Sequence, residues 1–385
     1  MENDPRRDSG FTLYYYGINM GAFWASILCA GLGLVYGWAW GFGLAGIGML
    51  AGFVVFVLGK PLLEGKGEPP NPEFLKKKIA GPIDREWLTY ILAILGVGAV
   101  YLLVQREPVV NWLLLICSIG VLAYFGVYMA TKCTAVEAQR IVLALVLVAA
   151  SVIFWTLFEL AGTALNQFAE RNTALPSNGF WSMTSGQTQS FNSGFILLLA
   201  PIFAAAWVWL AKHKKEPNDA MKFALALMQV GAGFLVLVWG ALYADAAAKV
   251  PLVFLVLLYL LHTTGELCLS PVGLSAMTKL APAPVLSTMM ATWFLASSAA
   301  QALGAQISKL TAAETVGGQV LDPHAALNTY VGVFQQIGIG AIVIGVGLAA
   351  ASPWLKKLAH APEGGTGTLP ESAELAEAAK TRAPS

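Results

Sequence analysis

The stretch VPLVFLVLLYLLHTTGELCLSPVGLSAMT, residues 250–278, decides the fold class of this protein. It is longer than the roughly 20 apolar residues that a helix needs to cross the hydrocarbon core of a bilayer, and it contains one carboxylate, Glu266. The whole chain of 385 residues has the same character, because 57% of it is hydrophobic, 12% is charged and the mean hydropathy is +0.66. Soluble domains carry about 25% charged residues, so the composition excludes a soluble enzyme, a disordered chain and a disulfide scaffold.

Apolar segments of this kind follow one another along the chain. Each is continuous over spanning length, whereas the strands of a membrane β-barrel alternate in polarity over about 10 residues. We therefore predict an all-α polytopic membrane protein with about ten transmembrane helices. The segments lie near residues 12–34, 38–59, 87–105, 110–130, 142–166, 189–211, 222–243, 250–278, 286–308 and 328–352.

Lysine and arginine are unevenly divided between the two sides of these segments. If the N-terminus is cytoplasmic, all of the 23 basic residues except Arg106, Arg171, Lys249 and Lys309 fall on the cytoplasmic side. Cytoplasmic loops carry an excess of Lys and Arg, so this division predicts that both termini are cytoplasmic. The net charge of +1 gives no general attraction for nucleic acid, and no nucleic-acid partner is expected.

The sequence lacks the motifs of soluble enzymes and of metal sites. Its four cysteines, Cys29, Cys117, Cys133 and Cys268, are widely spaced in or beside apolar segments, so we interpret them as small apolar side chains. The patterns His-Glu-x-x-His, Gly-x-Ser-x-Gly and the Walker loop do not occur. We expect no metal, and the missing Walker loop argues against ATP-driven pumping by this chain.

Two carboxylates lie inside apolar segments, where a charge costs on the order of 2.5–3.5 kcal/mol on insertion scales. The first, Glu159, shares one face of a helix with Trp155, Gly162 and Asn166, because these residues are spaced four, three and four apart. One interpretation of Glu159 is a buried pair that serves packing alone. The favoured interpretation is a cavity-lining residue that exchanges a proton or forms an ion pair.

The second carboxylate, Glu266, shares a face with Ser270, and Pro271 is expected to kink the helix or free a carbonyl beside them. A kink beside a charge is tolerated where backbone lines a water-filled cavity, so a substrate or proton site is favoured over a structural role. Two ligands do not make a metal site, so His262 is expected to form a structural hydrogen bond. Trp293 is interpreted as lining a cavity, with an interfacial tryptophan as the alternative.

Four motifs resemble, in order and spacing, those of the proton-dependent oligopeptide transporters of the major facilitator superfamily. In that family they belong to the fifth, seventh, tenth and eleventh transmembrane helices. The resemblance covers roughly residues 4–355. The motifs are DPRRDSGFTLYYYGINMGAF at 4–23, FWTLFE at 154–159, GELCLSPVGLS at 265–275 and WFL at 293–295.

The resemblance implies a partial major facilitator superfamily fold. The family's first four helices, with a Glu-x-x-Glu-Arg motif on the first and a lysine on the fourth, have no counterpart, so we expect an incomplete copy that does not transport by itself. The implied division is 1–60, the last two helices of the N-terminal half; 61–86, a cytoplasmic loop; 87–130, an inserted helical hairpin; 131–355, the C-terminal six-helix half; and 356–385, a disordered cytoplasmic tail.

The function implied by the resemblance is symport of di- and tripeptides with protons across the bacterial cytoplasmic (inner) membrane, with the proton as coupling ion and no other cofactor. Its partners are the peptide, the proton and the lipid bilayer, and the oligomeric state stays open. Glu159 and Glu266 are the implied proton-coupling residues. The implied peptide-binding residues are Tyr15, Asn19, Trp155, Asn192, Glu266, Ser270 and Trp293.

Two departures from the family pattern and two rival functions accompany this prediction. Leu160 and Ser193 stand where glutamine and proline are frequent in the family, which leaves peptide selectivity open. One rival is a polytopic membrane enzyme that acts on a lipid-linked substrate, for which a catalytic cluster near a membrane face is needed. The other is a non-transporting membrane protein that binds partners through the loop 60–85 with its three consecutive lysines.

Overall fold

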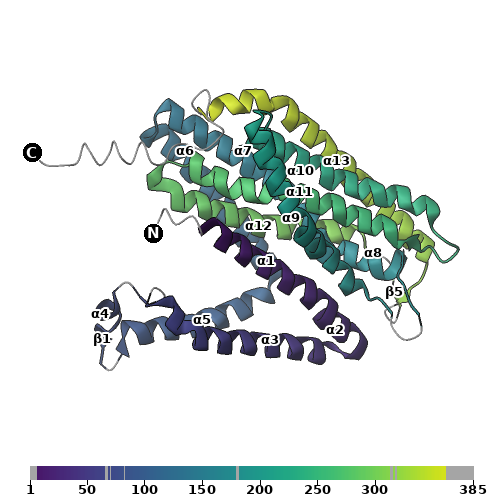
Figure 1. Ribbon diagram of the computed structural model, residues 1–385, viewed down its shortest axis with the longest axis horizontal. Helices are drawn as coiled ribbons and strands as arrows, with labels where there is room; N and C mark the ends of the chain where they lie inside the picture. The colour runs from purple at the N-terminus through teal and green to yellow at the C-terminus, as the bar shows by residue number, and fades with distance from the viewer. Residues whose placement is uncertain are drawn as a thin grey trace, which may run out of the picture.

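The computed structural model describes residues 7–65, 68–69, 71–81, 83–178, 182–312, 315–316 and 319–360. The side chains of residues 7–13, 15, 80, 315–316 and 319–320 lie outside this description, as does the predicted tail from residue 361 onward. Helices make up most of the described chain (Figure 1), which confirms the all-α prediction.

Thirteen α-helices follow one another in the described residues. Some spans are extended or interrupted by short π or 3₁₀ turns, as at Ser26–Ala30, Lys60–Leu63, Glu159–Gly162 and Ser185–Gln189. The helices are α1 (Arg7–Ala25), α2 (Gly31–Tyr36), α3 (Trp38–Gly59), α4 (Pro72–Leu75), α5 (Arg85–Val104), α6 (Glu107–Lys132), α7 (Ala135–Phe158), α8 (Ala164–Asn172), α9 (Ser190–Lys212), α10 (Asp219–Gly240), α11 (Leu252–Leu280), α12 (Leu286–Leu310) and α13 (Pro323–Leu358).

The strands of the described chain are short and form three two-stranded pairs in the loops. β1 (Lys78–Ala80) pairs antiparallel with β2 (Ile83–Asp84), and β5 (Thr315–Val316) pairs antiparallel with β6 (Gln319–Val320). β3 (Thr173–Ala174) pairs in parallel with β4 (Val250–Pro251), with Thr173 opposite Val250. This last pair joins the loop after α8 to the loop before α11.

Each of the ten predicted segments contains a helix. Nine spans in the described chain are long and apolar enough to cross a membrane, and the protein is an integral membrane protein. The remaining segment, 286–308, forms α12, a helix of 25 residues. It is not among the nine spans, and it contains several serine, threonine and glutamine residues. It packs against α7 and α6, and among its serine, threonine and glutamine side chains Thr292 is buried.

The fifth predicted segment is not one continuous helix. α7 ends at Phe158, Glu159–Gly162 form a 3₁₀ turn, and Thr163 has φ −127° and ψ −97° before α8 begins. Glycine and β-branched threonine have low helix propensity, and together they end the helix here. The prediction that Asn166 shares a continuous helix face with Glu159 is therefore wrong, whereas Trp155 lies one helical turn before Glu159, whose N–H donates to the Trp155 carbonyl.

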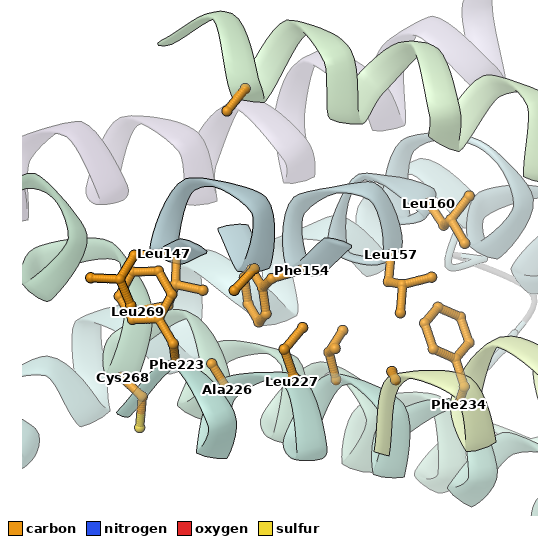
Figure 2. Close-up of a cluster of buried hydrophobic side chains, with 14 of the residues drawn as sticks. Leu147, Phe154, Leu157, Leu160, Phe223, Ala226, Leu227, Phe234, Cys268 and Leu269 are labelled. Atoms are coloured by element: carbon orange, nitrogen blue, oxygen red, sulfur yellow. The ribbon is translucent and has the colours of Figure 1, made fainter. Parts of the chain in front are cut away.

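The core of the protein lies between α7, α10, α11 and α13. α10 packs along both α11 and α13, and α7 contacts α10 and α11. In Figure 2, Leu147, Phe154 and Leu157 of α7 point toward Phe223 and Leu227 of α10, and all five side chains are buried. Because lipid tails are as apolar as these side chains, close van der Waals packing rather than exclusion of water holds the helices together in a membrane.

Glycines allow α10 and α13 to approach backbone to backbone. A Cβ atom built on Gly231 would lie 2.5 Å from the carbonyl oxygen of Gly338, and one built on Gly338 would lie 2.9 Å from the carbonyl oxygen of Gly231. Gly345 makes a similar approach to Met228. Small residues in α13 thus serve helix packing.

The N-terminal helices reach the rest of the bundle through α9. Figure 1 shows α1 running from the N-terminus along α9, whereas α3 and α5 extend away from the bundle. Phe23 of α1 packs on Gly194 of α9, where a Cβ would lie 3.2 Å from its ring. Past α1 the helix widens into a π turn, Ser26–Ala30, and the side-chain amide of Gln187 donates to the Ile27 carbonyl at 3.0 Å.

Candidate substrate-binding site

The predicted residues Asn192 and Glu266 meet in the structure. The Nδ2 atom of Asn192, on α9, donates a hydrogen bond to Oε2 of Glu266, on α11, at 3.0 Å. The same nitrogen donates to Oγ1 of Thr263 at 3.0 Å. Both Asn192 and Glu266 are partly buried, so a ligand can still reach them.

Two close contacts hold α11 in place beside Glu266. The His262 ring, almost fully buried, forms a 3.1 Å hydrogen bond through Nε2 with the Val230 carbonyl of α10, which confirms the structural role expected for it. Gly265 lies where a Cβ would be 3.1 Å from both the Ala226 carbonyl and the Phe154 ring. A side chain at this position would push α11 away from α7 and α10, so glycine fixes where Glu266 is presented.

Glu159 occupies the 3₁₀ turn that follows α7. Its side chain is exposed, and no described residue forms a hydrogen bond or salt bridge with it. The structure therefore places Glu159 at a break between α7 and α8, where its carboxylate is open to a ligand or an ion.

The two predicted aromatic residues have different surroundings. Trp155 is partly buried and makes edge-to-face contacts with Phe154 and Phe158, at ring separations of 5.4 Å and 5.2 Å. Trp293 is buried with 7% exposure, and its ring covers Gly273 of α11 so closely that a Cβ there would lie 2.0 Å from it. Trp155 is thus open to a ligand from one side, while Trp293 forms part of the wall behind α11.

The remaining predicted residues lie on α1 and α11. Asn19 is buried on α1, the helix that packs against α9. Tyr15 lies on the same helix one turn earlier, but its side chain falls outside the described residues. Ser270 is partly buried one turn after Glu266 and makes no hydrogen bond through its side chain to another described residue.

Two polar residues at the site were not anticipated from the sequence. Thr263 is fully buried and accepts the Asn192 amide, and Gln187 joins the loop before α9 to the π turn after α1. Thr263 is three residues before Glu266, a spacing that places both on one helix face. The sequence could therefore have indicated Thr263 as a neighbour of Glu266. The contact of Gln187 could not be inferred in this way, because it joins two segments that lie far apart in the chain.

The described part of the chain gives little support for metal binding or for disulfide chemistry. No cluster of three or more His, Cys, Asp or Glu residues there could hold a metal ion. The four cysteines are free, as the sequence predicts.

Comparison with known proteins agrees with this arrangement. The sequence profile of the POT family matches residues 1–324 of the chain. The chain belongs to the POT family. Its relatives include the uncharacterized transporter YclF of Bacillus subtilis, 35% identical over 364 residues, which are 92% of this chain and 69% of the relative. Dipeptide and tripeptide permease A of Edwardsiella piscicida is 31% identical over 360 residues, 93% of this chain and 70% of the permease.

Solved structures of POT family members share the fold. A mutant peptide transporter POT in complex with alafosfalin superposes with a TM-score of 0.72 at 35% identity, over 92% of this chain and 69% of that one. A POT family transporter in complex with 5-aminolevulinic acid gives a TM-score of 0.71 at 28% identity, over 92% of this chain and 71% of that one. These matches identify the helical bundle as the fold of POT transporters, a family of carriers rather than enzymes.

Proposed function

We propose that the chain serves proton-coupled symport of di- and tripeptides across the bacterial cytoplasmic membrane. The observation that carries this proposal is the hydrogen bond between Asn192 and Glu266, which joins α9 and α11 beside a carboxylate with one oxygen unused. A carboxylate in a partly dehydrated site is a natural partner for the ammonium group of a peptide. The relatives named as dipeptide and tripeptide permeases support the choice of substrate.

In this proposal Glu266 binds the amino terminus of the peptide and Asn192 contacts its backbone. Trp155 supplies an aromatic surface that is accessible from one side, and Trp293 supports the helix that carries Glu266. Ser270 lies one turn beyond. Asn19, buried on α1, contributes from the helix that packs against α9, and the role of Tyr15 rests on the family resemblance alone.

The proton step is assigned to Glu159 and Glu266. Two carboxylates that repel each other at short range do not both stay ionised as easily as one alone. A peptide ammonium that binds at Glu266 supplies a positive charge, and protonation of Glu159 removes a negative one. The two halves of the fold rock around the site during transport. Peptide binding at Glu266 and protonation of Glu159 exchange these charges during that movement, which links peptide transport to proton transport.

The membrane orientation is also a proposal, with both termini in the cytoplasm. Two contacts support the division of basic residues behind it. Lys309 forms a 2.7 Å salt bridge with Glu107, next to Arg106, and Lys249 donates to the carbonyl of Arg171 at 2.7 Å. Each contact joins two loops whose basic residues are predicted on the outer side, as expected of loops on one face. The division of the chain at 60, 86, 130 and 355 is also a proposal, and it rests on the family resemblance.

A binding experiment tests the peptide site. We would measure the affinity of the chain in lipid nanodiscs for dialanine and for N-acetyl-dialanine, which lacks the ammonium group. Glu266→Gln removes the charge but keeps the shape, and the loss of a charged hydrogen bond predicts about 10- to 100-fold weaker dialanine binding. Glu170→Gln, an exposed carboxylate at the end of α8, is the matched control and should leave binding unchanged.

The outcomes separate the candidate functions. Equal dialanine affinity in the wild type and Glu266→Gln refutes the site assignment. Lack of dialanine binding by the wild type refutes the peptide site altogether.

A further inference from the structure

The hydroxyl group of Thr263 uses its one proton in a hydrogen bond within α11. The side chain is fully buried, and its Oγ1 donates to the carbonyl of Tyr259, one turn earlier on α11, at 2.7 Å. A hydroxyl has one proton, so after this bond Oγ1 can act toward other groups as an acceptor alone. Oγ1 of Thr263 therefore accepts the hydrogen bond from the side-chain amide of Asn192.

The amide of Asn192 therefore has one stable orientation. Its Nδ2 carries two protons, and it lies 3.0 Å from Oγ1 of Thr263 and 3.0 Å from Oε2 of Glu266, so each proton has an acceptor. A 180° flip would bring Oδ1 against two acceptor atoms and leave both donors unused. Each unmade hydrogen bond in a buried place is costly, so the pair formed by Thr263 and Glu266 excludes the flipped form.

The atoms left for a ligand are both acceptors. Within the described chain neither Oδ1 of Asn192 nor Oε1 of Glu266 makes a hydrogen bond, and neither is among the buried polar atoms without a partner. They thus stay accessible. An ammonium group offers three donors and no acceptor, and it matches this pair, while an amide-blocked terminus has a single N–H to offer.

We propose that Thr263 is a positioning residue for substrate selection: it holds the Asn192 amide with its oxygen toward the peptide, so that the site prefers a free amino terminus. The proposal rests on the peptide-transport function proposed above and adds to it a residue that does not touch the peptide. Thr263 acts through Asn192, and its own hydroxyl stays out of reach of the ligand.

Three variants test this role. Thr263→Val keeps the size and β-branching but removes the acceptor, and Thr263→Ser keeps the hydroxyl. Thr156→Val is the matched control, because Thr156 is buried on α7 and makes the same type of bond to the carbonyl four residues earlier, at 2.7 Å, without accepting a described side chain. Each variant is compared with the wild-type chain in nanodiscs by its affinity for dialanine and N-acetyl-dialanine.

We expect Thr263→Val to lower the affinity for dialanine about tenfold, the effect of one misplaced hydrogen bond to a charged group. The preference for dialanine over N-acetyl-dialanine should fall by a similar factor, while Thr263→Ser stays within about twofold of the wild type. The proposal is overturned if Thr263→Val keeps the wild-type preference, even when both affinities fall together, because that is the behaviour of a residue that serves packing alone. It is also overturned if serine fails to rescue valine.

A second measurement needs no ligand. In the chain labelled with ¹⁵N-asparagine, the side-chain amide signals of Asn192 are assigned by their loss in Asn192→Asp. Thr263→Val should shift one of the two amide protons upfield, as a lost hydrogen bond does, and Thr263→Ser and Thr156→Val should leave both in place. Unchanged signals in Thr263→Val refute the orientation argument. Lack of dialanine binding by the wild type instead refutes the peptide site and the selectivity that depends on it.

Discussion

The contact between Gly231 and Gly338 yields a sharp prediction about stability. Gly231→Ala places a methyl group 2.5 Å from the Gly338 carbonyl oxygen, 2.9 Å from Cγ1 of Ile342 and 3.0 Å from Cβ of Ala341. Comfortable separations of non-bonded heavy atoms are about 3.5–4.0 Å, so the helices must part by roughly 1 Å. The obstructing oxygen belongs to the backbone of α13 and cannot turn aside as a side chain does.

The expected cost follows from the physics of overpacking. An extra methyl group in a well-packed core costs about 1–3 kcal/mol, and separation of α10 from α13 also weakens the neighbouring approach of Gly345 to Met228. The alanine substitution by itself favours a helix by about 1 kcal/mol relative to glycine. We therefore expect a net destabilisation of up to about 2 kcal/mol, from the difference of these two effects, and a stability about 1–3 kcal/mol below that of an alanine variant at an uncrowded helical glycine.

The assay is reversible unfolding of the chain in mixed micelles with increasing sodium dodecyl sulfate, followed by tryptophan fluorescence. Gly340→Ala is the control, because Gly340 lies on α13 two residues beyond Gly338 and a Cβ there meets no atom within 4 Å. That variant should be neutral or slightly more stable. If Gly231→Ala is as stable as Gly340→Ala, the close approach of the two backbones does not hold the helices together.

Two further contacts give measurable predictions. Gln187→Leu removes the bond to the Ile27 carbonyl and should loosen the π turn that contains Cys29; mass spectrometry should detect faster maleimide labelling of Cys29, and an unchanged rate counts against the contact. Lys222→Met removes the buried lysine that forms a salt bridge with Glu216. It should lower the free energy of unfolding by about 1–3 kcal/mol in the same assay. The added change Glu216→Gln should recover part of this loss, and no recovery contradicts the pairing.

The sequence was most informative where a residue was out of place for its surroundings. A carboxylate inside an apolar run is costly unless it has a function or a partner, and this argument led to Glu266 before any contact was known. The structure supplies the partner, Asn192, on a helix some seventy positions away in the chain. The sequence of neither helix by itself indicates that these two side chains form a hydrogen bond.

The sequence was least reliable where helix geometry was extrapolated through a weak point. The apolar run around Glu159 is long enough for one helix, and periodicity then places Asn166 on the face of Glu159. The break at Gly162 and Thr163 interrupts the helix between these two residues. Tertiary contacts decide whether such a sequence continues as a helix, because propensities of a few tenths of a kcal/mol per residue are easily overridden.

By itself the sequence determined that the chain crosses a membrane, where its spans lie and which residues are candidates for the site. These properties follow from the solvent: a bilayer accepts apolar helices of a fixed length and rejects unpaired charges. The tertiary structure alone decided which candidates meet, that Thr263 orients Asn192, and that Glu159 stands in a helix break. Hydrogen bonds and close packing act over a few ångströms, so they depend on how separate helices are placed rather than on the order of residues within one of them.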